Sequence, residues 1–180
     1  MKEKKITIIV PTYNEINNIE KFEDSISKLK GNFDIIFSDG FSKDGTFEKI
    51  SYPKIQQAKG RGAQLNAGAS LAKTQYLWFV HIDSIPHLDS IKAIENSNVD
   101  LGCFTIKFDK QTPLMKFEQW CSNIRVPMRN IAFGDQGIFI KRDLFEKIGG
   151  YRDIPIMEDY QLSIDMKNLG IKFKQLKLPI

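Results

Sequence analysis

Apolar residues in the first half of the chain fall into short runs of strand length, separated by stretches with helical spacing. The strand-like segments are residues 6–10, 33–38, 54–57 and 76–80. The intervening helix-like segments are residues 15–30, a short helix after the turn at Asp44-Gly45, and residues 62–72. This alternation of strand and helix predicts an α/β fold, with a mostly parallel central sheet and helices on both faces.

The second half continues the same pattern. It predicts helices over residues 87–96, from Pro113 onward, and over 142–148 and 159–169, with strands over 99–108, 136–141 and 171–178. In the helix that starts at Pro113, the residues Leu114, Phe117, Trp120 and Cys121 share one face. No repeat or linker divides the chain, so we expect one domain over residues 1–180.

Composition narrows the class of protein. Hydrophobic residues make up 42% and charged residues 27% of the 180 residues, as in ordinary soluble folded proteins. The longest apolar runs, residues 6–10 and 76–80, are far shorter than the roughly 20 residues of a membrane helix, and the first does not resemble a signal peptide. Cys103 and Cys121 lack metal-binding spacing, which favours two reduced thiols and a cytoplasmic protein.

The net charge of +4 is modest. Nucleic-acid binders concentrate far more positive charge on one face, so we expect no nucleic-acid partner. A small anionic ligand such as a nucleoside diphosphate suits this excess better. Lys172, Lys174 and Lys177 leave open a contact with an anionic membrane surface, although their alternation with apolar residues is also typical of a solvated strand face.

Candidate chemistry lies at the ends of the predicted strands, where open parallel sheets bind ligands. Pro11, Thr12, Tyr13 and Glu15 follow the first strand; they could form a helix cap, or Tyr13 could stack on a flat base. Asp39 follows the second strand, where a carboxylate can accept hydrogen bonds from a ribose or a uracil-like base, although Asp-Gly steps are also common in turns.

Three further segments carry charged side chains. Arg61, between two glycines at a helix start, suits either an anion site or an exposed turn. Asp83 leaves the strongest strand and can hold a divalent cation, and His81 is either a second ligand or a structural histidine. Glu158 and Asp159 begin a helix, where acids favour the positive dipole end but can also serve as a general base.

Six segments in this order resemble the family 2 glycosyltransferases of the GT-A fold. They are PTYNE, SDGFSKDGT, KGRGAQLNAG, HIDS, GDQGIFIKRDLFEKIGGY and MEDYQL, spread from residue 11 to residue 162. Each segment alone is weak evidence for the family, but six of them in this order make the match specific. The sequences GRGAQLNAGA, GDQGIFI and IPIMEDYQL look closest to a bacterial subgroup described as selenodomain-associated transferases.

The resemblance implies a nucleotide-diphospho-sugar donor, a divalent cation (Mg²⁺ or Mn²⁺) and inversion at the anomeric carbon. The implied donor-side residues are Pro11, Thr12, Tyr13 and Glu15 around the nucleoside, Asp39 at the base, and Arg61 at the nucleotide. Asp83 matches the last acid of the family's metal motif, whereas His81 stands in place of its first acid.

For catalysis the resemblance implies that Asp159 is the general base, with Glu158 beside it, and that Gly134, Asp135 and Gln136 face the acceptor. The chain ends soon after its last predicted strand, earlier than relatives of this kind, so we expect a domain that is short at its C-terminus. The resemblance leaves the acceptor unnamed, and it leaves open a place at the inner face of the membrane.

Two other functions remain open at this stage. A sugar-nucleotide nucleotidyltransferase shares the nucleotide-binding fold, but it would need a glycine-rich, basic triphosphate loop near the N-terminus, which PTYNEINN does not provide. A catalytically silent nucleotide-binding or interaction module is favoured by His81 and by the short C-terminus.

Overall fold

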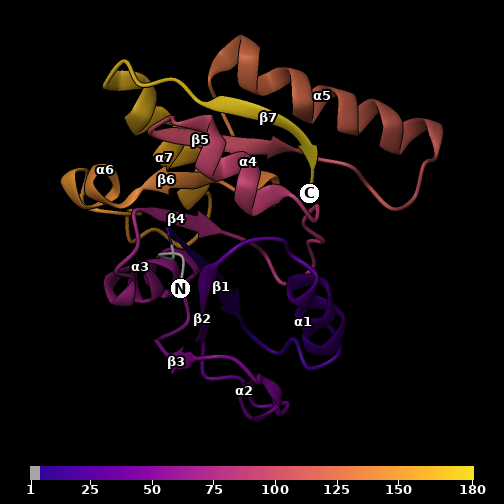
Figure 1. The fold of residues 1–180 in the computed structure, drawn as a ribbon, viewed down its shortest axis with the longest axis vertical. Coiled ribbons are helices and arrows are strands. Elements are labelled where there is room, and N and C mark those ends of the chain that lie inside the picture. The colour runs from indigo at the N-terminus through magenta and orange to yellow at the C-terminus, as the bar shows by residue number, and fades with distance from the viewer. Residues whose placement is uncertain (1–4) are drawn as a thin grey trace.

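A computed structural model describes residues 5–180, which form a central sheet with helices around it (Figure 1). The sheet has seven strands in the order β3-β2-β1-β4-β6-β5-β7. The strands are β1 (Ile6–Thr12), β2 (Phe33–Asp39), β3 (Lys54–Gln56), β4 (Tyr76–Phe79), β5 (Leu101–Thr105), β6 (Phe139–Lys141) and β7 (Lys174–Pro179). β6 runs antiparallel to β4 and β5, and the other pairs are parallel, which confirms the mostly parallel sheet.

Helices cover both faces of this sheet, as the apolar pattern predicts. The helices are α1 (Ile19–Ser27), α2 (Thr46–Lys49), α3 (Arg61–Leu71), α4 (Ser90–Ser97), α5 (Pro113–Arg129), α6 (Arg142–Lys147) and α7 (Glu158–Asn168), with a 3-10 turn, η1 (Gly134–Gln136). Successive residues of β1 face opposite sides: Ile8 belongs to the apolar cluster that includes residues of α1 and α4, and Ile9 to the cluster that includes residues of α3, α6 and α7. A strand buried on both faces therefore appears in the sequence as a continuous apolar run.

Several element boundaries differ from the sequence prediction: the helix predicted from residue 87 begins at Ser90, the strand predicted over 99–108 spans Leu101–Thr105, and the strand predicted from residue 171 begins at Lys174. Two further differences have a local cause. The helix predicted from residue 15 begins at Ile19, because Asn14 adopts a left-handed conformation (φ 55°) and its backbone N–H donates to Ser42 Oγ at 2.8 Å. The strand predicted from residue 136 begins at Phe139, because Gly134–Gln136 forms the η1 turn. Gly137 follows that turn with φ 57°, a conformation that favours glycine.

α5 has its apolar face toward solvent. Leu114, Phe117 and Trp120 share one side of the helix as predicted, but their exposed fractions are 67%, 59% and 58%. The opposite side of α5 is held by polar side chains: Asn123 exchanges hydrogen bonds with the backbone of Ile106, at 2.8 and 3.0 Å. None of the described helices combines the length and apolar content that crossing a membrane requires.

Candidate active site

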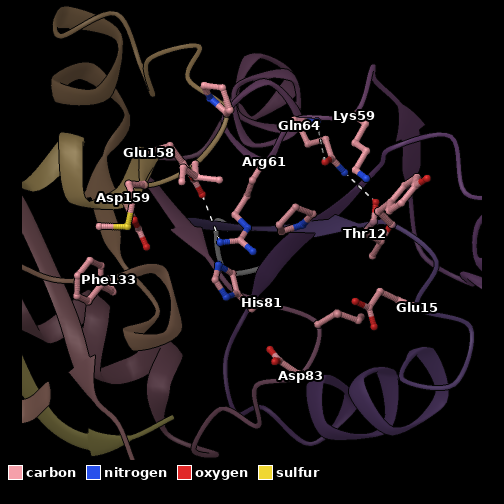
Figure 2. A pocket seen from close by; sticks show the side chains of 17 residues that line it. Thr12, Glu15, Lys59, Arg61, Gln64, His81, Asp83, Phe133, Glu158 and Asp159 are labelled. Carbon is pink, nitrogen blue, oxygen red and sulfur yellow. Dashed lines mark hydrogen bonds and ion pairs between the residues drawn. The ribbon is translucent and has the colours of Figure 1, made fainter. Parts of the chain in front are cut away.

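The predicted site residues meet at a cavity of about 550 Å³ beyond the carboxyl ends of β1 and β4 (Figure 2). Nine of them line it: Pro11, Thr12, Tyr13, Glu15, Arg61, His81, Asp83, Glu158 and Asp159. They come from the end of β1 and the residues after it, from the segment after β4, and from the first turns of α3 and α7. Four distant parts of the sequence thus form one site, at the edge where open α/β sheets bind ligands.

Asp39 lies behind the wall of this cavity. Its side chain is completely buried, and its carboxylate accepts hydrogen bonds from Thr12 Oγ1 (3.1 Å) and from the backbone N–H of Ser42 (2.8 Å). Asp39 therefore joins the ends of β1 and β2 and does not line the cavity in this structure. Its contact with a base stays a prediction.

Gln64 is a cavity residue that the sequence analysis did not identify. Its side chain is 4% exposed, and its amide Nε2 donates to the carbonyl oxygens of Thr12 (2.8 Å) and Ser38 (2.7 Å). Gln64 thereby connects α3 to the ends of β1 and β2. A polar residue on the inward face of an Ala-rich helix was the available signal, because buried amides are kept where they form hydrogen bonds.

Tyr13 and Lys59 form the outer wall on the β1 side. The Lys59 ammonium lies 4.0 Å from the centre of the Tyr13 ring, a cation–π contact. Glu15 lies nearby and accepts a 2.6 Å hydrogen bond from the Asn18 side chain. This part of the lining includes an aromatic ring, a cation and a carboxylate.

Arg61 provides positive charge at the centre of the cavity, between Glu158 and His81 in Figure 2. Its guanidinium lies 3.6 Å from the Glu158 carboxylate, which is only 3% exposed. The positive charge of Arg61 therefore compensates the negative charge of this buried acid. Burial lowers the pKa of His81, and the positive charge of Arg61 lowers it further. His81 is therefore a neutral imidazole at pH 7, the form that coordinates metals.

Asp159 is held in place by two backbone donors. Its Oδ2 accepts from the N–H of Gly134 at 2.7 Å, and its Oδ1 accepts from the N–H of Tyr160 at 2.6 Å. A Cβ on Gly134 would lie only 2.6 Å from His81 Nε2, so the absence of a side chain allows this close approach. Gly134 thus carries a structural role beside the catalytic candidate.

The other two predicted acceptor-side residues differ in their surroundings. Gln136 is fully buried, and its Oε1 accepts a 3.3 Å hydrogen bond from the Phe133 N–H. Asp135 lines a second cavity of about 710 Å³, which shares Asp83 with the first. Burial raises the pKa of Asp135, and the nearby Asp159 and Asp83 add to that rise, whereas Arg125 opposes it.

His81 and Asp83 suit a cation that a ligand helps to bind. In the part of the chain that the structure describes, no three His, Cys, Asp or Glu side chains gather closely enough to hold a metal by themselves. Mg²⁺-type cations are commonly held by one or two carboxylates, with phosphate oxygens and water completing the shell. One carboxylate and one neutral imidazole in the same cavity fit that arrangement.

Comparison with sequence families gives a match to the model of "Glycosyl transferase family 2" over residues 7–148. Among curated proteins, the chain is similar to glycosyltransferase AglE of Haloferax volcanii (24% identity over 81% of this chain and 55% of AglE). It is also similar to the probable glycosyltransferase YdaM of Bacillus subtilis (23% identity over 94% of this chain and 48% of YdaM). The chain spans about half the length of these relatives.

Solved structures share the fold. The mannosyltransferase PcManGT from Pyrobaculum calidifontis, in complex with GDP-Man and Mn²⁺, matches with a TM-score of 0.76 at 19% identity, over 99% of this chain and 57% of PcManGT. TarS from S. aureus in complex with UDP matches with a TM-score of 0.72 at 18% identity, over 98% of this chain and 60% of TarS. The predicted GT-A fold is therefore confirmed.

Proposed function

This chain belongs to glycosyl transferase family 2, and we propose that it transfers a sugar, with inversion, from a nucleotide-diphospho-sugar to an acceptor hydroxyl. The observation that carries the proposal is the convergence of Arg61, Asp83 and Asp159 on one cavity. Similar structures bind GDP-Man with Mn²⁺ and UDP, which supports a nucleotide-sugar donor and a divalent cation. We take a UDP-linked sugar as the first donor to test.

The donor would occupy the half of the cavity between β1 and α3. Tyr13 offers a ring for the base, with Pro11, Thr12 and Glu15 around the nucleoside. Arg61 faces the diphosphate, and its positive charge stabilises the charge that develops on the leaving group. Its ion pair with Glu158 limits the orientations that the guanidinium can adopt.

His81 and Asp83 would hold the divalent cation, Mg²⁺ or Mn²⁺, together with the donor. When bound, this cation would neutralise negative charge on the diphosphate. Because His81 is neutral, Asp83 supplies the anionic ligand on the protein side. Asp83 also lines the second cavity beside Asp135, so the acceptor would approach from that side.

Asp159 would remove the proton from the acceptor hydroxyl. A hydroxyl is a poor nucleophile at neutral pH, and a positioned general base accelerates such a reaction by roughly 10²–10⁴-fold. The N–H groups of Gly134 and Tyr160 fix the orientation of this carboxylate without using its charge in an ion pair. Gly134, Asp135 and Gln136 would face the acceptor, and the backbone N–H of Gly134 binds the carboxylate of Asp159.

Asp159→Asn tests this assignment. We expect release of UDP or GDP from a panel of nucleotide-sugars with Mn²⁺ to fall by about 10²–10⁴-fold, with donor binding retained in calorimetry. Asp165→Asn is the matched control: Asp165 lies on the same helix, but it pairs with Arg152 (2.7 Å) outside the cavity. Thermal melting of both variants shows whether lower activity comes from the missing base or from a destabilised fold.

The same assay distinguishes the other candidate functions. Donor binding by the parent protein without release of nucleoside diphosphate would indicate a silent nucleotide-binding module, a reading that His81 in place of an acid favours. Release of pyrophosphate from a nucleoside triphosphate and a sugar phosphate would indicate a nucleotidyltransferase. Unchanged turnover in Asp159→Asn would remove Asp159 from the mechanism, and turnover unaffected by EDTA would remove the cation.

A further inference from the structure

The outward face of α5 carries a continuous apolar stripe, which we call the α5 stripe: Leu114, Phe117, Trp120 and Met128. Their exposed fractions range from 58% to 71%. The rings of Phe117 and Trp120 stack with their centres 6.1 Å apart. Exposed apolar residues that are scattered singly need no explanation, but a row of four along one helix is typical of an interaction surface.

The orientation of α5, with the stripe toward solvent, is fixed by hydrogen bonds on the opposite side of the helix. The inner side of α5 is fixed by Asn123, which binds the backbone of Ile106, and by Gln119, whose Oε1 accepts from the Phe108 N–H at 3.2 Å. Val126 is the buried apolar residue that joins this side to the core. Because polar groups hold the inner side, rotating the helix to bury the α5 stripe would break these hydrogen bonds.

Basic residues outnumber acidic ones in α5 and in the segments of the chain next to it. The C-terminal end of α5 is tied to the segment before β7, because the Asn130 side chain binds the backbone of Ile171 (2.8 Å) and Phe173 (2.7 Å). Residues 107–129 and 172–177 together contain eight basic and two acidic side chains. Two of the basic side chains face the candidate site, since Arg125 lies over the Phe133 ring and Lys107 lines the second cavity. The other six are Lys110, Lys116, Arg129, Lys172, Lys174 and Lys177.

We propose that the α5 stripe and its basic surroundings bind the surface of an anionic lipid bilayer. Leu, Phe and Trp on one side of a helix, flanked by Lys and Arg, is the pattern by which helices lie in the membrane interface. Anionic lipid headgroups attract the basic residues, and the apolar side chains insert at the boundary of the acyl chains. A second copy of the chain fits less well, because two positively charged faces would repel each other.

The experiment measures binding of the full chain to phosphatidylcholine vesicles with and without phosphatidylglycerol. We expect binding to the mixed vesicles at low salt, little binding to phosphatidylcholine alone, and loss of binding near about 0.5 M salt, where charges are strongly screened. Phe117→Ser combined with Trp120→Ser should weaken partitioning about tenfold or more. Leu71→Ser combined with Leu88→Ser is the control, since these side chains are 51% and 41% exposed and lie outside the α5 stripe.

Tryptophan fluorescence gives a second readout that does not depend on the variants. The chain has two tryptophans: Trp78 is fully buried, and Trp120 is 58% exposed. A blue shift on addition of anionic vesicles would therefore report Trp120 entering the interface. The proposal is overturned if no shift and no binding occur, if the α5 double variant binds as well as the parent, or if the α5 stripe instead drives dimerisation in sedimentation velocity. These outcomes are independent of sugar transfer.

Discussion

Replacing Gln64 with leucine should lower the free energy of unfolding by an amount that the two lost hydrogen bonds determine. Leucine keeps a similar volume but removes the donors to Thr12 O and Ser38 O. Each such bond contributes about 0.5–1.5 kcal/mol net, which gives about 1–3 kcal/mol for the pair. Thr12 O keeps a second donor, the Gly40 N–H at 2.8 Å, so the loss at this carbonyl should not reach the larger cost of a fully orphaned group.

Urea unfolding followed by circular dichroism measures this change, with thermal melting as a check. For a domain of this size, 1 kcal/mol corresponds to roughly 2–4 °C in Tm. Gln161→Leu is the control, because its amide donates to Asp165 on the outer side of α7 (3.0 Å), and a change below about 0.5 kcal/mol is expected there. If Gln64→Leu also stays within about 0.5 kcal/mol of the parent, Gln64 does not stabilise the junction of β1, β2 and α3.

Two further predictions concern titrating groups. Cys103 is fully buried, and burial raises the pKa of its thiol. A thiol reagent such as DTNB at pH 8 should therefore modify only Cys121 in the native protein and both cysteines in denaturant. Rapid modification of Cys103 in the native protein would contradict its burial. Hydrogen bonds from Thr46 and Ile16 lower the pKa of Asp44 below its ordinary 3.8, so its stabilisation is fully present above about pH 4 and is lost as the pH falls through the folded-state pKa. Asp44→Asn should therefore lower the free energy of unfolding at pH 7, and its difference from the parent should shrink in acid; a difference that is independent of pH would show that the charge does not matter.

The sequence predicted the order of strands and helices well, because the central strands are buried on both faces. Ile8 and Ile9 belong to different apolar clusters, so the run that contains them is apolar except for Thr7, which is also buried. Boundaries were less accurate where a loop has its own hydrogen bonds. Ile16 lies at helical spacing, yet its N–H donates to Asp44 at 3.1 Å and the chain there is a loop. For α5, periodicity identified an apolar face but could not tell which side the core would take.

The candidate site was predictable in so far as it follows the ends of strands. His81 and Asp83 came directly from that rule, and the structure brings them to the same cavity as Asp159. Asp39 obeys the same rule but does not line the cavity: it is fully buried, and its oxygens accept hydrogen bonds from Thr12 and from the Ser42 backbone. Position along the chain therefore selects carboxylates near a site, but it does not show which of them line the cavity.

The charge balance of the cavity supports the proposal that a divalent cation accompanies the donor. Four carboxylates line it (Glu15, Asp83, Glu158 and Asp159), against two permanent cations, Lys59 and Arg61. His81 contributes no compensating charge, since burial lowers its pKa. A diphosphate entering this cavity would add negative charge to an excess of negative charge, and like charges at short range in a partly buried site repel strongly. A divalent cation beside Asp83 would cancel this excess of two negative charges, so a cavity that repels a free diphosphate could accept a metal–diphosphate complex.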